Sequence, residues 1–213
     1  SAPKYDRPRG PDPSLPARHA FDPKTIPAPA SYGEELLGLI GTPNVGSKRW
    51  VYRQYDSIVR GGTAVRPGDG DAAVVRVPCE RDGKVLHKLL AFSCDGNGRF
   101  VDLDPFVGGA MVIAEVCRNL VVTGGEPLGI TDCLNFGNPE NPVVMEQFAR
   151  AIDGMAAACR ALEVPIVSGN VSLYNDTDGR PILPTPTVAA VGILRDEGDL
   201  VRATWSAMNN VIV

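Results

Sequence analysis

Two long stretches of the chain repeat apolar residues every three or four positions, which is typical of amphipathic helices. The first is expected to begin at Asp104, as N-cap, with Pro105 in its first turn, and to end at Gly124. The second is expected to begin at Asn141-Pro142. The predicted buried face of the first helix comprises Val107, Ala110, Met111, Ala114, Cys117 and Val121, and that of the second comprises Met145, Phe148, Ile152, Met155, Cys159 and Leu162.

Shorter apolar runs predict strands. They cover residues 71–77, 88–94, 127–136, 164–169 and 185–194, and Asp82-Gly83 is a hairpin signal between the first two. The last run is nearly free of charge, so it must be covered on both faces or buried against another subunit. The order strand, strand, helix, strand, helix, strand, strand predicts an α/β (α+β) fold, a mixed sheet with helices on one face.

The first 30 residues follow no such period. Residues 1–30 contain 8 of the 19 prolines, and proline removes an amide donor and fixes φ, so neither a helix nor an inner strand is expected there. We interpret residues 1–30 as a proline-rich linker, laid over a surface or disordered. Ordered structure is expected from Ser31, which opens a capping-box pattern and a helix ending at Gly41. Residues 47–56 predict a further helical turn or two.

Composition narrows the class of protein. The chain has 213 residues and a net charge of −4, so a nucleic-acid surface is not expected. No apolar stretch reaches the roughly 18–20 residues that span a bilayer, and no signal peptide opens the chain. Five scattered cysteines and two histidines favour neither a disulfide framework nor a zinc cage. We expect a cytoplasmic protein with buried, reduced thiols and no membrane partner.

Polar clusters at strand ends contain the candidate residues for binding or catalysis. Asp95 opens a loop that begins like a calcium site, but Arg99 and Phe100 occupy positions where a ligand and a glycine are required. The loop is therefore a glycine-rich turn with a helix cap, or a place where Asp95 approaches Mg²⁺. Asp132 interrupts an apolar strand. It either lies on the solvated face or, as alternation with Ile130 and Leu134 favours, shares their inward face. A carboxylate there must be paired, hydrogen-bonded or close to a cation.

A third cluster follows the run "PIVSGN". The apolar strand is expected to stop at Gly169, where the backbone has no Cβ to keep a phosphate away. Asn170 and Ser172 offer neutral oxygens that suit Mg²⁺, although a plain turn explains the same residues. The chain has no P-loop and no GxGxxG motif opening a helix. It also has no Ser-His-Asp set, and we assign no catalytic residue.

Long strings of the chain resemble phosphoribosylformylglycinamidine synthase, an enzyme family of purine synthesis, and more narrowly the second of its two internally repeated halves. The strings are "QYDSIVRGGTAVRPGDGDAAVVRV", "DPFVGGAMVIAEVCRNLVVTGGEPLGITDCLNFGNPENP" and "PIVSGNVSLYNDTDGRPILPTPTVAAVGIL". The resemblance implies an aminoimidazole ribonucleotide synthetase-like domain over residues 31–196, whose sheet is half of a β-barrel completed by a partner domain or a second copy. Residues 197–213 then connect to a missing C-terminal domain.

The resemblance also implies a reaction and a site. The family converts formylglycinamide ribonucleotide to the amidine, using ATP, Mg²⁺ and ammonia that a glutaminase subunit or domain takes from glutamine. By motif, Asp132 and Gly169 resemble ATP contacts, Asn170 resembles a Mg²⁺ ligand, and Ser172 resembles a contact to the nucleotide substrate. We expect these segments to lie side by side at one rim of the sheet.

The chain departs from the family at one strand end. Where the family's first half carries a glutamate and histidines, this chain has "FSCDGNG", residues 92–98. The resemblance therefore implies a fragment that is inactive alone. Two alternatives remain: a non-catalytic half-barrel that acts as an assembly surface, or another ATP-dependent enzyme of the same superfamily.

Overall fold

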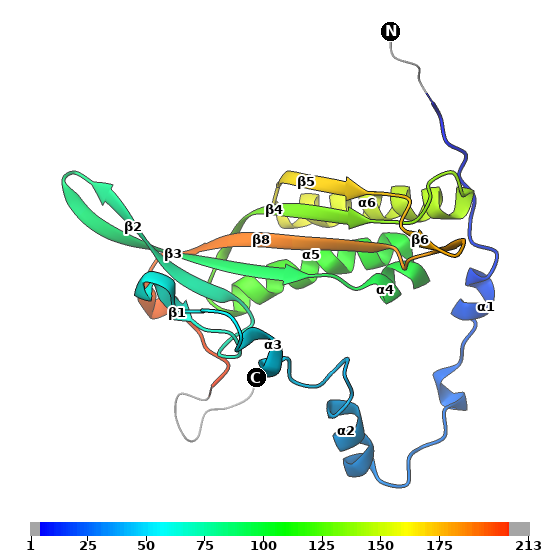
Figure 1. The fold of residues 1–213 in the computed structure, drawn as a ribbon, viewed down its shortest axis with the longest axis horizontal. Helices are drawn as coiled ribbons and strands as arrows, with labels where there is room; N and C mark the ends of the chain where they lie inside the picture. Colours follow the sequence, from blue (N-terminus) through cyan, green and yellow to red (C-terminus); the bar gives the residue numbers. More distant parts are fainter. Residues whose placement is uncertain (1–4, 205–213) are drawn as a thin grey trace.

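The computed structural model describes residues 5–204, and its main body is built on one six-stranded mixed sheet. The strand order is β1-β2-β3-β8-β4-β5, and a separate small hairpin pairs β6 with β7. All neighbours in the large sheet are antiparallel except β4 and β5, which are parallel. The fold class predicted from the apolar pattern is confirmed, with helices on one face of a mixed sheet (Figure 1).

The strands are β1 (Thr63–Val65), β2 (Ala73–Arg81), β3 (Lys84–Asp95), β4 (Glu126–Asn135), β5 (Ile166–Ser172), β6 (Asp176–Thr177), β7 (Arg180–Pro181) and β8 (Thr185–Leu194). The helices are α1 (Leu15–His19), α2 (Tyr32–Ile40), α3 (Arg49–Tyr52), α4 (Gly98–Leu103), α5 (Pro105–Val122) and α6 (Pro142–Leu162), with 3-10 turns η1 (Pro23–Thr25), η2 (Val59–Gly61) and η3 (Glu197–Asp199).

Local sequence signals account for most element boundaries. Asp104 accepts hydrogen bonds from two amides of the first turn of α5, and Asn141 accepts one from the first turn of α6. Ser31 caps α2 as expected, and the helix ends at Gly41. At the β2–β3 turn, Asp82 and Gly83 both have positive φ, which matches the twist of a tight hairpin.

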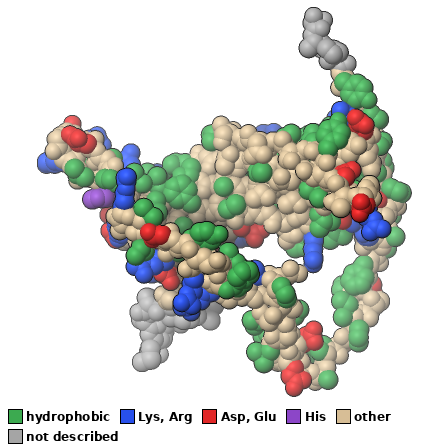
Figure 2. All heavy atoms as spheres, viewed as in Figure 1, with side chains coloured by type: hydrophobic (Ala, Val, Ile, Leu, Met, Phe, Trp, Pro, Cys, Tyr) green, Lys and Arg blue, Asp and Glu red, His purple; other side chains and the backbone are tan. Residues whose placement is uncertain are grey.

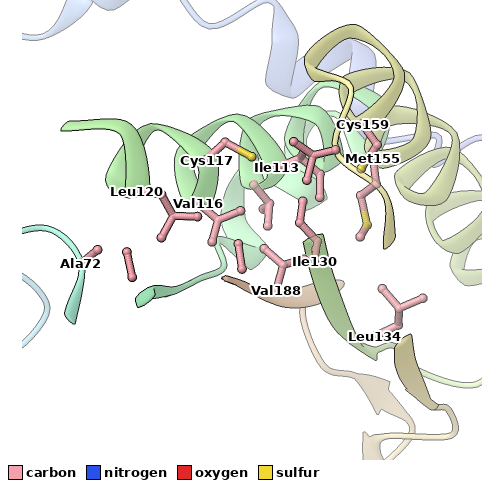
Figure 3. Close-up of a cluster of buried hydrophobic side chains, with 14 of the residues drawn as sticks. Ala72, Ile113, Val116, Cys117, Leu120, Ile130, Leu134, Met155, Cys159 and Val188 are labelled. Atoms are coloured by element: carbon pink, nitrogen blue, oxygen red, sulfur yellow. The ribbon is translucent and has the colours of Figure 1, made fainter. Parts of the chain in front are cut away.

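The core lies between the sheet and the α5–α6 layer (Figure 3). Buried side chains from the strands, among them Ile130 and Val188, meet Ile113, Val116 and Leu120 of α5. All five have 0% of their surface exposed. We call this side of the sheet the covered face. The other side, the open face, carries Leu90, Phe92, Thr131, Cys133, Ala189 and Val191.

The predicted buried face of α5 is mostly wrong. Val107, Met111 and Val121 are 48%, 43% and 57% exposed, and of the predicted face only Cys117 is fully buried. The residues that pack inward are Gly108, Gly109, Val112, Ile113, Val116, Cys117 and Leu120. Because α5 is apolar nearly all round, periodicity cannot select its inner side. For α6, Met155 and Cys159 are buried as predicted, while Ile152 and Leu162 are 37% and 45% exposed.

Helix α5 also corrects the expectation about membrane spans. Among the described residues it is the one helix long and apolar enough to cross a bilayer by length and composition. Eight of its residues are buried against the protein, so its apolar character is accounted for by the core.

The prediction of buried cysteine thiols is confirmed only in part. Cys117 and Cys159 are buried as expected, whereas Cys94 is exposed.

The proline-rich start contains a helix that the proline argument excludes. Helix α1 forms because Pro16 stands in its first turn, where a missing amide is tolerated, and no further proline follows before Pro23. Arg18 fixes the segment by ion pairs to Asp12 and Asp102 at 2.7 and 2.5 Å. This part of the segment is therefore laid over a surface, one of the two predicted arrangements.

Candidate functional site

The segments around Asp132 and Gly169 lie on neighbouring strands, as expected. In the parallel β4–β5 pair, Asp132 is opposite Gly169, Cys133 is opposite Asn170, and the register continues to Ser172. All four candidate residues therefore lie in the middle or the carboxyl-terminal part of two adjacent strands, β4 and β5 (Figure 1).

The strand is not interrupted at Gly169, contrary to the sequence prediction. Strand β5 continues through Gly169 and Asn170 to Ser172, and it is an exposed edge strand rather than a buried one. Its exposure follows from its position at the end of the sheet, beyond β4. An edge strand leaves one row of backbone groups unpaired by the sheet, and these groups are available to a ligand.

Gly169 is required by the side chain of Asp132. A Cβ at residue 169 would lie 2.0 Å from Asp132 Oδ1, which no real contact allows. The carboxylate therefore lies directly over the Gly169 backbone. It does so on the covered face, because Asp132 pairs with the buried Val188. The space that sequence reasoning reserved for a phosphate is occupied, on this face, by the carboxylate.

The environment of Asp132 is partly desolvated. Burial beneath α6 raises the pKa of the Asp132 carboxyl, and its negative charge contributes to the raised pKa of the Cys159 thiol on that helix. Among residues 5–204 no hydrogen bond reaches the Asp132 carboxylate. Such a carboxylate destabilises the fold unless a cation or donor approaches it.

Asn170 and Ser172 occupy the opposite face of the sheet. Asn170 is exposed, and its amide donates to Cys133 Sγ at 3.4 Å, which places it on the open face. Ser172 follows two residues later on the same side, and its hydroxyl donates to Asn175 Oδ1 at 3.2 Å. The predicted residues are thus brought together in register but divided between two faces, Asp132 on one and Asn170 with Ser172 on the other.

Asn175 is a site residue to which sequence reasoning gave no role. Its side-chain amide donates to the carbonyl oxygens of Phe136 and Ser172 at 2.9 and 3.0 Å, and so joins the ends of β4 and β5. Nearby, Tyr174 adopts φ of 62° and its hydroxyl accepts from Arg7 at 3.1 Å. The polar string "SLYND" was the available signal, but spacing alone does not reveal which carbonyls it reaches.

Two further expectations about metal ligands can be compared with the geometry. The Asp95 carboxylate accepts hydrogen bonds from Ser93 at 2.8 Å and from Asn119 at 3.1 Å, so it is already satisfied beneath α5. Within the part of the chain that the structure describes, no group of three His, Cys, Asp or Glu side chains is arranged to hold a metal ion. Asn170 offers an amide oxygen, which is not one of these side-chain types.

Comparison with known proteins shows which family the chain resembles. The sequence model of the family described as "AIR synthase related protein, N-terminal domain" matches residues 69–194. A curated relative, phosphoribosylformylglycinamidine synthase subunit PurL of Anaeromyxobacter dehalogenans strain 2CP-C, is 54% identical over 211 residues, which are 99% of this chain and 28% of the relative. The PurL subunit of Bradyrhizobium diazoefficiens is 52% identical over 195 residues, 92% of this chain and 25% of the relative.

Solved structures agree. PurLQS from Thermotoga maritima aligns with a TM-score of 0.61 and 34% identity over 70% of this chain and 24% of that chain. T. maritima PurL complexed with ATP aligns with a TM-score of 0.57 and 34% identity, over 70% of this chain and 23% of that chain. The chain therefore spans somewhat more than a quarter of the length of the curated relative from A. dehalogenans.

Proposed function

The chain belongs to the family of AIR synthase related proteins, and on this premise we propose that it is the nucleotide-binding N-terminal domain of the second half of a phosphoribosylformylglycinamidine synthase. The whole enzyme would convert formylglycinamide ribonucleotide to the amidine with ATP and ammonia derived from glutamine. The remaining synthetase domains and a glutaminase subunit would be its partners, and the cytoplasm its location. The T. maritima relatives crystallised with ATP, ADP and AMPPCP support nucleotide binding.

The observation that carries the proposal is the register of β4 and β5, which places Asp132 against Gly169 and Asn170 one residue further on. In this proposal the unpaired edge of β5 and the exposed Asn170 amide face the polyphosphate on the open side. Asp132 acts from the covered side, where its carboxylate fixes the backbone of Gly169. Ser172, held by Asn175, is placed to contact the ribonucleotide substrate.

The residues present fit Mg²⁺ only as part of a shared shell. Mg²⁺ usually keeps several waters and takes one or two protein oxygens beside substrate phosphates, and the Asn170 amide can supply one neutral oxygen. When bound, the ion would neutralise phosphate charge during phosphoryl transfer. This chain would orient the nucleotide and exclude solvent on one side, while the groups that transfer protons would come from the other half.

Calorimetry with Mg·ATP tests the proposal. Wild type is expected to bind, and Asn170→Ala and Asp132→Ala are expected to bind at least about tenfold more weakly, because a ligand oxygen or the fixed backbone is lost. Asp153→Asn, an exposed carboxylate on α6, is the matched control and should bind like wild type. Equal affinity of all four proteins would remove Asp132 and Asn170 from the site.

Turnover is a second readout. The chain alone, incubated with ATP, ammonia and formylglycinamide ribonucleotide, is expected to give no amidine. Appreciable product would contradict its role as an incomplete half.

A non-catalytic assembly role is the second candidate, and the open face favours it. Phe92 on β3 is 43% exposed, and the middle of the open face carries apolar side chains with no cover among the described residues. Either the homologous half of the enzyme or a second copy would close the sheet into the expected barrel. Failure of wild type to bind Mg·ATP, together with dimerisation in sedimentation experiments, would favour this candidate.

A further inference from the structure

A hollow of about 560 Å³ lies beside the β1 end of the sheet, at the edge opposite β5. Its volume is in the range of small-molecule sites, about 300–1,000 Å³. Its lining includes Arg49, Arg53, Arg66, Tyr52, Tyr55 and Ser57. The hollow is therefore separate from the candidate site on β4 and β5.

The three arginines that line the hollow carry charge that the described protein does not neutralise. The ion pairs of residues 5–204 involve other arginines, at positions 7, 18, 76, 81 and 195. One acidic side chain, Asp69, lines the hollow against three guanidinium groups. In a chain whose net charge is −4, this is a local positive centre. Figure 2 shows basic side chains gathered over the α3 and β1 region.

Local structure brings these side chains together. Arg49 begins α3 and Arg53 caps its end, so the two lie four residues apart on one side of a single turn. Arg66 follows β1 directly and opens a tight loop in which the Asp69 amide donates to the Arg66 carbonyl at 3.0 Å.

The loop that carries Arg66 is fixed on both sides. Gly68 has φ of +89°, and a Cβ there would lie 3.0 Å from the Tyr52 hydroxyl, so glycine lets the loop close onto α3. On the other side, the Ala203 amide donates to the Asp69 carbonyl at 2.9 Å. The spacing between the arginines of α3 and Arg66 is therefore built into the fold.

From this arrangement we propose that the hollow binds the phosphate group of a small phosphorylated anion, a diphosphate or a nucleoside phosphate. Guanidinium groups bind phosphate oxygens in pairs and keep their charge at any physiological pH. The hydroxyls of Tyr52 and Tyr55 add neutral donors, and the ring of Tyr55, which is 71% exposed, offers a stacking surface for a base. Because arginines hold the anion, binding does not require a divalent metal.

Titration calorimetry with pyrophosphate in EDTA tests this site on the 213-residue chain. Wild type is expected to bind, and Arg53→Gln/Arg66→Gln is expected to bind at least about tenfold more weakly. Arg118→Gln, which removes an exposed arginine of α5, is the charge-matched control and should stay within about twofold of wild type. Thermal melting of each protein establishes that it is folded.

A second titrant separates the two sources of phosphate. ADP that binds more tightly than pyrophosphate, with the gain lost in Tyr55→Ala, identifies a nucleoside phosphate; equal affinities identify a phosphate group alone. No binding of pyrophosphate by folded wild type, or equal binding by the double arginine variant, overturns the proposal. Because EDTA removes Mg²⁺, and because the double arginine variant leaves Asp132 and Asn170 intact, this result stands or fails apart from the Mg·ATP experiment.

Discussion

The two faces of the central sheet are made from the same strands and from similar side chains, yet they differ in what covers them. On β3, Ala91 is 0% exposed and its neighbour Phe92 is 43% exposed. On β8, positions alternate without exception between buried and partly exposed. Side-chain hydrophobicity does not determine which face is buried, because the exposed Phe92 is larger and more apolar than the buried Ala91. The buried face is the one that α5 and α6 cover.

Because the two faces differ in cover, we expect most of the covered face to serve stability and the open face to serve binding or assembly. The covered face packs against α5 and α6, which cross so closely that a Cβ at Gly109 or Gly154 would clash with backbone, and on this face the Asp95 carboxylate accepts hydrogen bonds from Ser93 and Asn119. The open face carries Asn170, Ser172 and Cys133 beside apolar side chains that no described residue covers. Substitutions of apolar residues on the covered face should therefore change folding, whereas those on the open face should change binding or assembly.

The largest effect is expected where α5 and α6 cross. A Cβ at Gly154 would lie 1.9 Å from the Phe106 carbonyl oxygen and 2.8 Å from its carbonyl carbon. Gly154→Ala must push the helices apart, and we expect a loss of roughly 2–4 kcal/mol in the free energy of unfolding, measured by urea denaturation. Gly38→Ala on α2, where nothing lies within 4 Å of the new Cβ, is the control and should cause no loss. If Gly154→Ala were as stable as Gly38→Ala, α5 and α6 would not be in close contact where they cross.

A matched pair on β8 compares the faces directly. Val188 is 0% exposed on the covered face, and Val191 is partly exposed on the open face. Val188→Thr buries a hydroxyl and is expected to lower the free energy of unfolding by roughly 1–2 kcal/mol. Val191→Thr leaves the hydroxyl near solvent and should stay within about 0.5 kcal/mol of wild type. Equal losses in the two variants would show that the open face is as desolvated as the covered one.

Most of the fold could be predicted from the sequence because its signals are local. Asp104-Pro105, Asn141-Pro142 and Asp82-Gly83 each define an element boundary through one or two residues. Strand β1 was missed, since residues 63–65 stand in a glycine-rich stretch that reads as a loop. The inner side of α5 could not be chosen, because its deciding contacts are those of Gly108 and Gly109 with distant backbone, which no periodicity records.

The candidate site could be predicted only in part, because the sequence contains its local signals but not its tertiary contacts. Alternation placed Asp132 inward with Ile130 and Leu134, and the structure agrees. The role of Gly169 required knowing which residue lies opposite it, and parallel register is a tertiary property. Similarly, the division of Asp132 and Asn170 between two faces follows from β5 continuing as an edge strand, which a run of polar residues after an apolar run does not indicate.

The smallest effect concerns Asp132, and its sign depends on pH. Burial raises the pKa of this carboxyl above its unfolded value of about 3.9. The folded protein therefore binds the proton more tightly, and its stability falls as the pH rises through the window between the two values. Above the folded pKa, the free-energy cost of burying the charged carboxylate is fully present.

Asp132→Asn removes this cost, and we expect Tm to rise by roughly 1–3 °C at neutral pH. The gain should shrink as the pH falls toward about 4, because the wild-type carboxyl is then protonated too. Thermal melts across this range measure it, with the exposed Asp153→Asn as a control that should show no such trend. A wild type more stable than Asp132→Asn at neutral pH would show that the carboxylate accepts stabilising bonds where it lies over Gly169, and that the covered face holds a charged group without cost to the fold.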